Sequence, residues 1–131
     1  MMLYKTLDAV MPQFRVIYAE FGITEQQWRV LRVLWERESM PLLELAELTL
    51  ISPPSLVGII DRLSKIAMVR RVRSELDRRV VNIEITLKGR VLKENVSPRV
   101  DAIYARLEES IDAELWAKML EAMDMLISAK A

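Results

Sequence analysis

The sequence has 131 residues, 52% of them hydrophobic, and its formal net charge is zero. This length predicts a single domain, and this composition is sufficient for a hydrophobic core. The sequence contains no cysteine and no histidine, which excludes disulfides and thiolate metal sites and removes the commonest general base. Hydrolytic, redox and zinc chemistry are therefore disfavoured, and we expect neither a metal site nor a cofactor.

The neutral net charge conceals a basic segment in the middle of the chain. Residues 62–90 carry nine Lys/Arg against three Asp/Glu, whereas residues 1–61 and 91–131 each carry five against eight. A local basic surface is expected of an element that binds phosphate groups. A solvated charged hairpin explains the charge equally well, but the neighbouring helices favour phosphate binding.

No apolar run reaches the roughly 18 residues that cross a bilayer. The N-terminus does not show the basic start and apolar block of a signal peptide. We therefore expect a cytoplasmic protein without a membrane partner.

The first predicted helix spans residues 3–21 and has a narrow apolar stripe of the coiled-coil kind. The stripe consists of Leu3, Leu7, Val10, Phe14, Ile17 and Phe21. Pro12 removes a backbone hydrogen bond and is expected to kink the helix, and Gly22 can end it in a left-handed conformation. A terminal helix with such a stripe often packs against another chain.

Two more helices precede the basic segment. Thr24 and Gln27 have the spacing of a capping box and predict a helix over residues 25–38. The residues that it is expected to bury are Trp28, Leu31, Leu34 and Trp35. A break at Met40-Pro41 separates it from a short helix that ends near Thr49. The apolar face of that short helix is Leu42, Leu45, Ala46 and Leu48.

The next helix begins at Pro53, because a proline at the first helical position loses no hydrogen bond, and Ser52 is its N-cap. Its predicted buried stripe is Leu56, Ile59, Ile60 and Leu63. The outward face then carries mainly small side chains. A short helix, a three-residue link and a second helix of this kind have the spacing of a helix-turn-helix.

The exposed start of this helix can enter a DNA major groove because its side chains are not bulky. The predicted contact residues are Ser52, Pro53, Ser55, Val57, Arg62 and Lys65. The serines can donate to phosphates or base edges, the valine can touch a thymine methyl group, and the basic residues can hold the backbone. Gly58 leaves the middle of the face bare, which predicts sparse base readout and a larger role for DNA shape. A plain helix cap is the alternative role for Ser52.

Residues 69–73 and 80–85 are predicted to form two strands around a charged tip. The candidate DNA contacts of this hairpin are Arg73, Arg78 and Arg79. An arginine gains from the deep negative potential of a narrow minor groove. Asp77 would itself repel DNA, so we interpret it as an acid that orients a neighbouring arginine through a charge-assisted hydrogen bond. A surface ion pair of little effect is the alternative.

The rest of the chain is predicted to be helical. Thr86 is expected to cap a long helix in which Gly89 permits a close contact and Pro98 causes a kink. The apolar stripe of that helix is Leu92, Val96, Val100, Ile103 and Leu107. Asp112 opens the last helix. Its stripe is Leu115, Met119, Met123, Leu126 and Ile127.

Together these motifs resemble the MarR family of bacterial transcription regulators over nearly the whole chain. The motifs that carry the resemblance are Thr24-Glu25-Gln26-Gln27-Trp28-Arg29-Val30-Leu31, the helix from Pro54-Ser55-Leu56 to Asp61-Arg62-Leu63, Asp77-Arg78-Arg79 and Leu87-Lys88-Gly89. The Glu-Gln-Gln-Trp-Arg stretch and the Pro-Pro-Ser-Leu start are most similar to the branch that represses homoprotocatechuate or 4-hydroxyphenylacetate degradation.

The resemblance implies a mainly α fold with a small β-hairpin in one domain. A winged helix-turn-helix would occupy about residues 24–88, and dimerisation helices would occupy about residues 3–21 and 89–129. It also implies an obligate homodimer on double-stranded DNA with a pseudo-palindromic operator, the fourth helix in the major groove and the wing in the minor groove. In the family's Asp-x-Arg pattern, Asp77 corresponds to the orienting acid and Arg79 to the minor-groove arginine.

Two positions depart from the family pattern. Ala67 stands where a glycine often follows the recognition helix, which puts the usual left-handed cap in doubt. Gly58 stands where a larger polar residue is common, which puts base-specific contact at that position in doubt.

The resemblance further implies a small aromatic acid as effector, bound between the dimerisation helices and the DNA-binding lobe. A carboxylate favours a fixed arginine, and a ring favours an apolar or aromatic wall. Arg15 with Tyr18, and Trp28 with Arg32, offer such pairs about one helical turn apart. A core role for Trp28, and a solvated or ion-paired role for either arginine, are the alternatives.

We therefore expect a ligand-responsive repressor of an aromatic-acid catabolic operon, released from its operator by a small aromatic acid. A winged-helix module that binds an acidic protein partner, without sequence-specific DNA binding, is the alternative. An enzyme is disfavoured, because its candidate carboxylate pairs lie on charged helical faces that are usually solvated. These pairs are Glu36 with Glu38 and Glu108 with Glu109.

Overall fold

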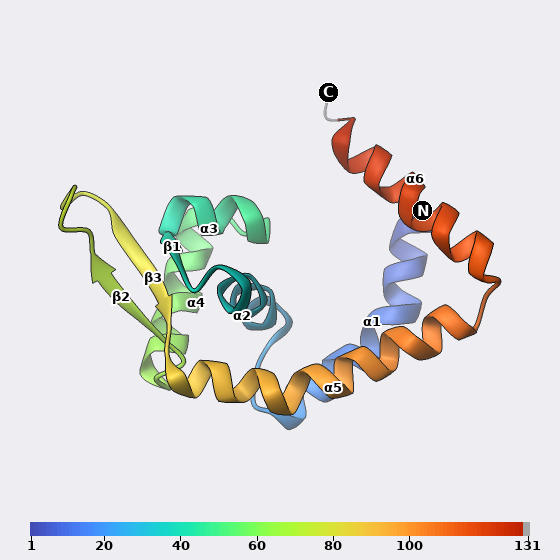
Figure 1. The fold of residues 1–131 in the computed structure, drawn as a ribbon, viewed down its shortest axis with the longest axis horizontal. Coiled ribbons are helices and arrows are strands. Elements are labelled where there is room, and N and C mark those ends of the chain that lie inside the picture. Colours follow the sequence, from blue (N-terminus) through green and yellow to red (C-terminus); the bar gives the residue numbers. More distant parts are fainter. Residues whose placement is uncertain (130–131) are drawn as a thin grey trace.

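The structure, a computed structural model, describes residues 1–129. In this range the chain forms six helices and a three-stranded sheet (Figure 1). The helices are α1 (Met2–Glu20), α2 (Glu25–Arg37), α3 (Leu42–Thr49), α4 (Pro53–Lys65), α5 (Leu87–Glu109) and α6 (Ala113–Ser128). The strands are β1 (Ser39–Pro41), β2 (Val69–Arg73) and β3 (Val81–Ile85). The predicted fold class, mainly α with a small β-hairpin in a winged helix-turn-helix, is confirmed.

The sheet is antiparallel throughout, with strand order β1-β3-β2. The hairpin pairs Val69 with Ile85 and extends to Arg73 opposite Val81. The break predicted at Met40-Pro41 is present between α2 and α3, and this segment additionally forms the edge strand β1, in which Met40 pairs with Ile83. Proline is tolerated there because an edge strand leaves some of its N–H groups unpaired in any case.

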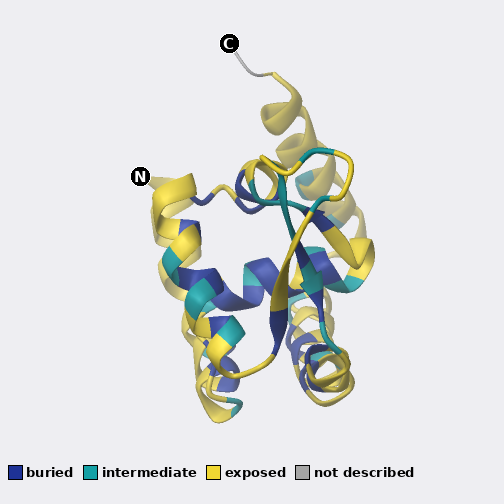
Figure 2. Ribbon diagram, turned by 90° about the vertical axis from the view of Figure 1, so that its left-hand side faces the viewer, coloured by how far each residue is buried: buried dark blue, intermediate teal, exposed yellow. Residues whose placement is uncertain are grey.

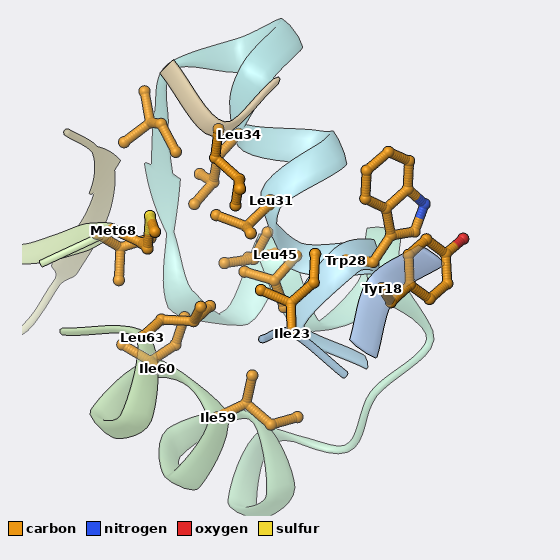
Figure 3. Close-up of a cluster of buried hydrophobic side chains, with 14 of the residues drawn as sticks. Tyr18, Ile23, Trp28, Leu31, Leu34, Leu45, Ile59, Ile60, Leu63 and Met68 are labelled. Atoms are coloured by element: carbon orange, nitrogen blue, oxygen red, sulfur yellow. The ribbon is translucent and has the colours of Figure 1, made fainter. Parts of the chain in front are cut away.

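The core of the winged lobe lies between α2, α3, α4 and the sheet (Figure 3). All four apolar residues predicted to line the inner face of α4 are buried. Two other predictions need correction. Trp35 is only half-buried, since its indole N–H must reach the carbonyl of Gly89 at 2.8 Å. Leu48 is exposed, because Leu45 and Thr49 occupy the inner face of this short helix.

The predicted helix boundaries rest on capping contacts that the structure contains. Thr24 and Gln27 form both hydrogen bonds of the capping box, at 3.0 and 3.1 Å. Gly22 ends α1 with a φ of 71°. Thr86 accepts from the N–H of Gly89 at 3.1 Å. A Cβ on Gly89 would lie 2.5 Å from the backbone oxygen of Met68, which confirms the close contact.

Helix α5 leads away from the base of the sheet, α1 packs along it, and α6 diverges toward the C-terminus (Figure 1). The two long helices are joined by Arg99, whose guanidinium donates to Glu20 at 2.8 and 3.3 Å. The predicted stripe of α5 is buried as far as Ile103. Helix α6 buries none of its residues, and exposed surface runs along its whole length (Figure 2).

Among residues 1–129, no single helix is both long and apolar enough to cross a membrane. Helices α3 and α4 meet the length and composition of a span only when taken together, and they are bent by 104°.

Candidate nucleic-acid interface and aromatic cleft

The N-terminal end of α4 presents two hydroxyl groups to solvent. Ser52 is the N-cap by its backbone, with Pro53 in the first turn, but its side chain makes no capping hydrogen bond. The Ser52 hydroxyl instead donates to the Ser55 hydroxyl at 2.9 Å. Both side chains are exposed. Because this hydrogen bond is open to solvent, the two hydroxyl groups can exchange it for one to a phosphate or a base edge.

The outward face of α4 is as sparse as the sequence predicts. Val57 is exposed, and a Cβ on Gly58 would meet nothing nearer than the Arg62 guanidinium at 3.9 Å. Arg62 and Lys65 are exposed at the C-terminal half of the helix. Neither forms an ion pair with any residue that the structure describes. Both positive charges are thus free to meet phosphates.

The first arginines of β2 are engaged within the protein. Arg71 forms an ion pair with Asp61 and donates to the carbonyl of Val57 at 3.4 Å, which joins the hairpin to α4. Arg70 pairs with Glu84 on β3 at 3.3 Å. The charge count alone did not separate these structural arginines from those available to a partner, because their acidic partners lie ten and fourteen residues away in the sequence.

At the wing, Asp77 holds Arg79 in one orientation. The backbone N–H and Nε of Arg79 donate to Oδ1 of Asp77 at 3.0 and 3.1 Å, and its Nη2 donates to Oδ2 at 3.2 Å. The side-chain hydrogen bond from Arg79 is the main cause that lowers the pKa of the Asp77 carboxyl below its ordinary value. The Arg79 side chain is nevertheless 91% exposed. The pairing predicted from the sequence is therefore present, and its positive group points outward.

Arg73 and Arg78, the other arginines predicted to contact DNA, are arranged differently. The Arg73 guanidinium donates to the carbonyl oxygen of Arg78, across the base of the tip. This contact uses Arg73 as a brace for the wing. The side chain of Arg78 is exposed. Of these two arginines, Arg73 is held by a hydrogen bond within the wing, whereas the Arg78 guanidinium faces solvent.

Helix α4 ends in a left-handed turn even though the residue there is alanine. Ala67 has a φ of 62°, and the N–H of Met68 reaches back to the carbonyl of Leu63 at 3.0 Å, as in a Schellman motif. The side chains of Thr86 and Lys88 donate to carbonyls of this turn at 2.6 and 2.8 Å. The departure from glycine has therefore not removed the cap, and α4 is fastened to the start of α5.

A cleft of about 320 Å³ lies between α2 and α5. Its lining residues are Trp28, Arg32, Trp35, Glu36, Lys93, Ser97, Val100, Asp101 and Tyr104. Trp28 and Arg32, two of the predicted ligand residues, thus meet in one site. Sequence reasoning missed the side contributed by α5. Its residues recur every three or four positions, but that spacing says nothing about which helix lies opposite.

Trp28 is both a core residue and a wall of this cleft. Tyr18 stacks on it with ring centroids 5.0 Å apart, and Trp35 meets it edge-on at 5.2 Å. Tyr18 lies beside the indole, among the buried residues (Figure 3), and does not line the cleft. Burial is the main cause that raises the pKa of its hydroxyl to about 12. Tyr18 therefore stays neutral and packs against the face of Trp28 without lining the cleft itself.

Arg15 lies apart from the other predicted ligand residues. Its Nε donates to the Glu25 carboxylate at 3.2 Å, and it does not line the cleft. Arg15 therefore has the ion-paired role given above as the alternative, whereas Arg32 lines the cleft. Within residues 1–129, no group of three or more acidic side chains is placed to hold a metal ion.

Comparison with known proteins agrees with this geometry. The model of the MarR family matches residues 23–81. The HTH-type transcriptional regulator FarR of Neisseria gonorrhoeae is 38% identical over 95% of this chain and 83% of its own. The homoprotocatechuate degradative operon repressor of Escherichia coli is 31% identical over 96% of this chain and 85% of its own.

Solved structures share the fold over nearly the whole chain. Transcriptional regulator PA4135 superimposes with a TM-score of 0.92 at 33% identity, over 99% of this chain and 96% of that one. NadR in complex with 4-hydroxyphenylacetate has a TM-score of 0.84 at 34% identity, over 98% of this chain and 91% of the NadR chain. The chain therefore belongs to the MarR family, and is a non-enzymatic, DNA-binding transcription regulator rather than a module specialised for protein partners.

Proposed function

We propose that this regulator is a repressor of an aromatic-acid catabolic operon and that a small aromatic carboxylate releases it from its operator. The observation that carries the proposal is the cleft between α2 and α5, where the Arg32 guanidinium lies with the ring of Trp28. The names of two relatives support it. One represses a homoprotocatechuate operon, and the other was solved with 4-hydroxyphenylacetate, and both compounds are aromatic acids.

The cleft residues suggest how such an acid would be oriented. Arg32 would take the carboxylate in a charge-assisted contact, and the aromatic side chains of Trp28 and Tyr104 would hold the ring. Glu36 and Asp101 bring negative charge to the same cleft. They would accept a hydrogen bond from a ring hydroxyl, while Lys93 in the same cleft offsets part of their charge. The proposed effector is therefore a hydroxylated aromatic carboxylic acid.

The helices outside the lobe support a homodimer. Helix α6 buries no residue within its own chain, and Leu115, Leu126 and Ile127 stay exposed on it. The first turns of α1 also expose Leu3 and Leu7. Contiguous apolar surface of this kind marks a protein interface. We assign α1, α6 and the outer part of α5 to dimerisation and the winged lobe to DNA.

A dimer would present two α4 helices to successive major grooves of a pseudo-palindromic operator, about one helical turn or ~34 Å apart. The contacts predicted from the sequence on α4 and the wing would then act in pairs. We call α1, α6 and the outer part of α5 the arms. Because α2 belongs to the lobe and α5 leads into the arms, a ligand between α2 and α5 would favour one angle between lobe and arms. Release from DNA requires that this angle differ from the one that fits the operator.

The test is a gel shift of the purified protein with the DNA upstream of its own gene, titrated with hydroxylated phenylacetic, benzoic and cinnamic acids. We expect a salt-sensitive shift that one class of acid reverses. Arg32→Ala should still bind DNA but should no longer respond to the acid. Arg15→Ala is the matched control and should respond like the wild type.

The outcomes separate the parts of the proposal. If DNA binds and none of the acids releases it, the aromatic effector is wrong. If Arg32→Ala and Arg15→Ala lose the response equally, the effector does not bind through the guanidinium in the cleft. If the upstream DNA shows no sequence-preferring shift, the protein does not regulate that promoter.

A further inference from the structure

The tip of the wing carries an apolar side chain that touches nothing in its own chain. Leu76 is 101% exposed, the highest value among the large apolar side chains of residues 1–129. Many of the other exposed apolar residues lie on α1 and α6, where a dimer partner would cover them. Leu76 has no such explanation, because the wing extends from the opposite side of the molecule (Figure 1).

The turn that holds Leu76 does not depend on it. The N–H of Ser74 donates to the carbonyl of Val80 at 2.9 Å, and the N–H of Val80 donates to the carbonyl of Asp77 at 2.9 Å. The N–H of Asp77 also donates to the Ser74 hydroxyl at 3.3 Å, and Arg73 braces the other side of the tip. These contacts fix the backbone on both sides of Leu76. The leucine is thus presented by an ordered turn and contributes no packing to it.

Leu76 shares this turn with the residue pair that orients the wing arginine. It directly precedes Asp77, whose carboxylate holds Arg79. A groove that accepts the exposed guanidinium of Arg79 therefore also receives the tip beside it. A leucine gains nothing from phosphates, but the deoxyribose walls of a minor groove are apolar, and proteins that bind there often insert apolar side chains.

We infer that Leu76 is a further DNA-contacting residue, which packs against deoxyribose in the minor groove beside Arg79. The inference rests on the proposed placement of the wing in that groove. The wing then makes two contacts of different physical kinds. Arg79 acts through charge and releases counterions, whereas Leu76 acts through burial of apolar surface and releases none.

The two kinds of contact predict different dependence on salt. We would measure the affinity for the upstream DNA by fluorescence anisotropy over a range of salt concentrations, for the wild type, Leu76→Ala, Leu76→Ser and Arg79→Ala. Both Leu76 variants should lose about tenfold in affinity per dimer, with an unchanged slope of log affinity against log salt concentration. Arg79→Ala should lose affinity and also lower the slope by about two per dimer.

Leu87→Ala is the matched control, because Leu87 is 77% exposed at the start of α5, at the base of the lobe and away from the wing tip. It should bind DNA like the wild type. Hydroxyl-radical footprinting reads the deoxyribose directly, and Leu76→Ala should weaken protection at the outer minor-groove positions only. All variants should keep the thermal unfolding midpoint of the wild type.

Several results would overturn the inference. Leu76→Ala affinity within twofold of the wild type at every salt concentration would show that the leucine makes no useful contact. A changed salt slope would mean that it acts by displacing Arg79. A changed oligomeric state of the free Leu76→Ala protein would assign the tip to a contact between protein chains. If Arg79→Ala also binds normally, the wing itself does not enter the groove, and the proposed placement fails with it.

Discussion

In the winged lobe, α2, α3 and α4 bury their apolar stripes against one another and the sheet, whereas α6 buries none of its own residues. The two regions are similar in sequence pattern, since both show apolar residues at helical spacing. They differ in whether the apolar residues are covered by other elements of the same chain. The lobe buries its apolar residues within its own chain, whereas α6 leaves its stripe uncovered there, and we propose that a second chain covers it.

The difference teaches that a one-sided apolar stripe indicates a buried face but not the chain that buries it. The stripe of α5 illustrates both cases, because it is buried by the lobe and by α1 as far as Ile103 but is only half-buried at Leu107. Stability of the lobe should therefore depend on its internal packing, while order in the arms should depend on protein concentration.

The largest effect should come from the lobe core. Leu45→Ala removes a fully buried side chain from α3 and leaves a cavity, so we expect a loss of about 3 kcal/mol in the free energy of unfolding. Leu43→Ala on the same helix changes an exposed leucine and should stay within about 0.5 kcal/mol of the wild type. Chemical denaturation at one fixed protein concentration measures both. Equal losses would mean that α3 is packed differently.

The arms should show the opposite behaviour. The double variant Met123→Lys with Leu126→Lys places two charges on the exposed apolar face of α6, and we expect the dimer dissociation constant to rise at least about a hundredfold. Sedimentation over a range of concentrations would measure this. Lys118→Ala is the control, because Lys118 pairs only with Glu114 on the surface of the same helix. A monomeric wild type would refute the assignment of α6 to dimerisation.

Gly89 tests the packing where α5 meets the lobe, and Gly58 on the open face of α4 is its control. Gly89→Ala would put a Cβ 2.5 Å from the Met68 carbonyl oxygen and from the Ile85 side chain, so we expect a loss of about 2 kcal/mol in stability from overpacking. A Cβ at position 58 would meet nothing nearer than the Arg62 guanidinium at 3.9 Å, so Gly58→Ala should stabilise α4 by up to about 1 kcal/mol. Thermal unfolding compares them. A Gly89→Ala protein as stable as the wild type would contradict the tight contact of α5 with Met68 and Ile85.

A smaller gain should come from the turn after α4. Ala67 has a φ of 62°, a conformation that costs a residue with a Cβ about 1 kcal/mol. Ala67→Gly should therefore stabilise the lobe by up to that amount. Ala105→Gly, exposed in the C-terminal part of α5, should destabilise by about 1 kcal/mol because glycine is a poor helix former. If both variants destabilise the protein, the left-handed turn is not strained.

Local signals predicted much of the lobe. The stripe of α4, its start at Pro53 and the caps at Thr24 and Thr86 could be predicted because each depends on residues within one or two turns. The Asp77–Arg79 pair was predictable for the same reason, with only one residue between its members. These are the places where sequence distance and spatial distance coincide.

The features that escaped prediction join distant parts of the chain. Strand β1 is three residues long and too short to show alternation, and it exists because β3 provides its hydrogen bonds. The half-exposed position of Trp35 escaped prediction because the acceptor of its indole N–H, the Gly89 carbonyl, is 54 residues away. The cleft needs α2 opposite α5, so Arg32 could be proposed from sequence while Lys93 and Tyr104 could not. The separate position of Arg15 follows from its ion pair with Glu25.

The smallest effect should come from Asp77, because its carboxylate only orients the neighbouring Arg79 side chain. The pKa of its carboxyl is lowered, so the charged pair with Arg79 is complete above the ordinary carboxyl pKa of 3.8 and is lost only as the pH falls through the lowered value. Operator affinity at pH 6 to 8 should therefore be independent of this group. Asp77→Asn should lower operator affinity by about threefold, since a solvent-exposed ion pair contributes little.

The control for Asp77→Asn is Glu75→Gln, which removes the same charge from the same tip without touching the pair. Removal of a negative charge alone should strengthen binding to operator and to unrelated DNA equally. Asp77→Asn should instead reduce the ratio between the two affinities, because the arginine loses its fixed orientation. If both variants behave alike, Asp77 acts only through its charge. The orientation of the Arg79 guanidinium would then come from the DNA and not from Asp77.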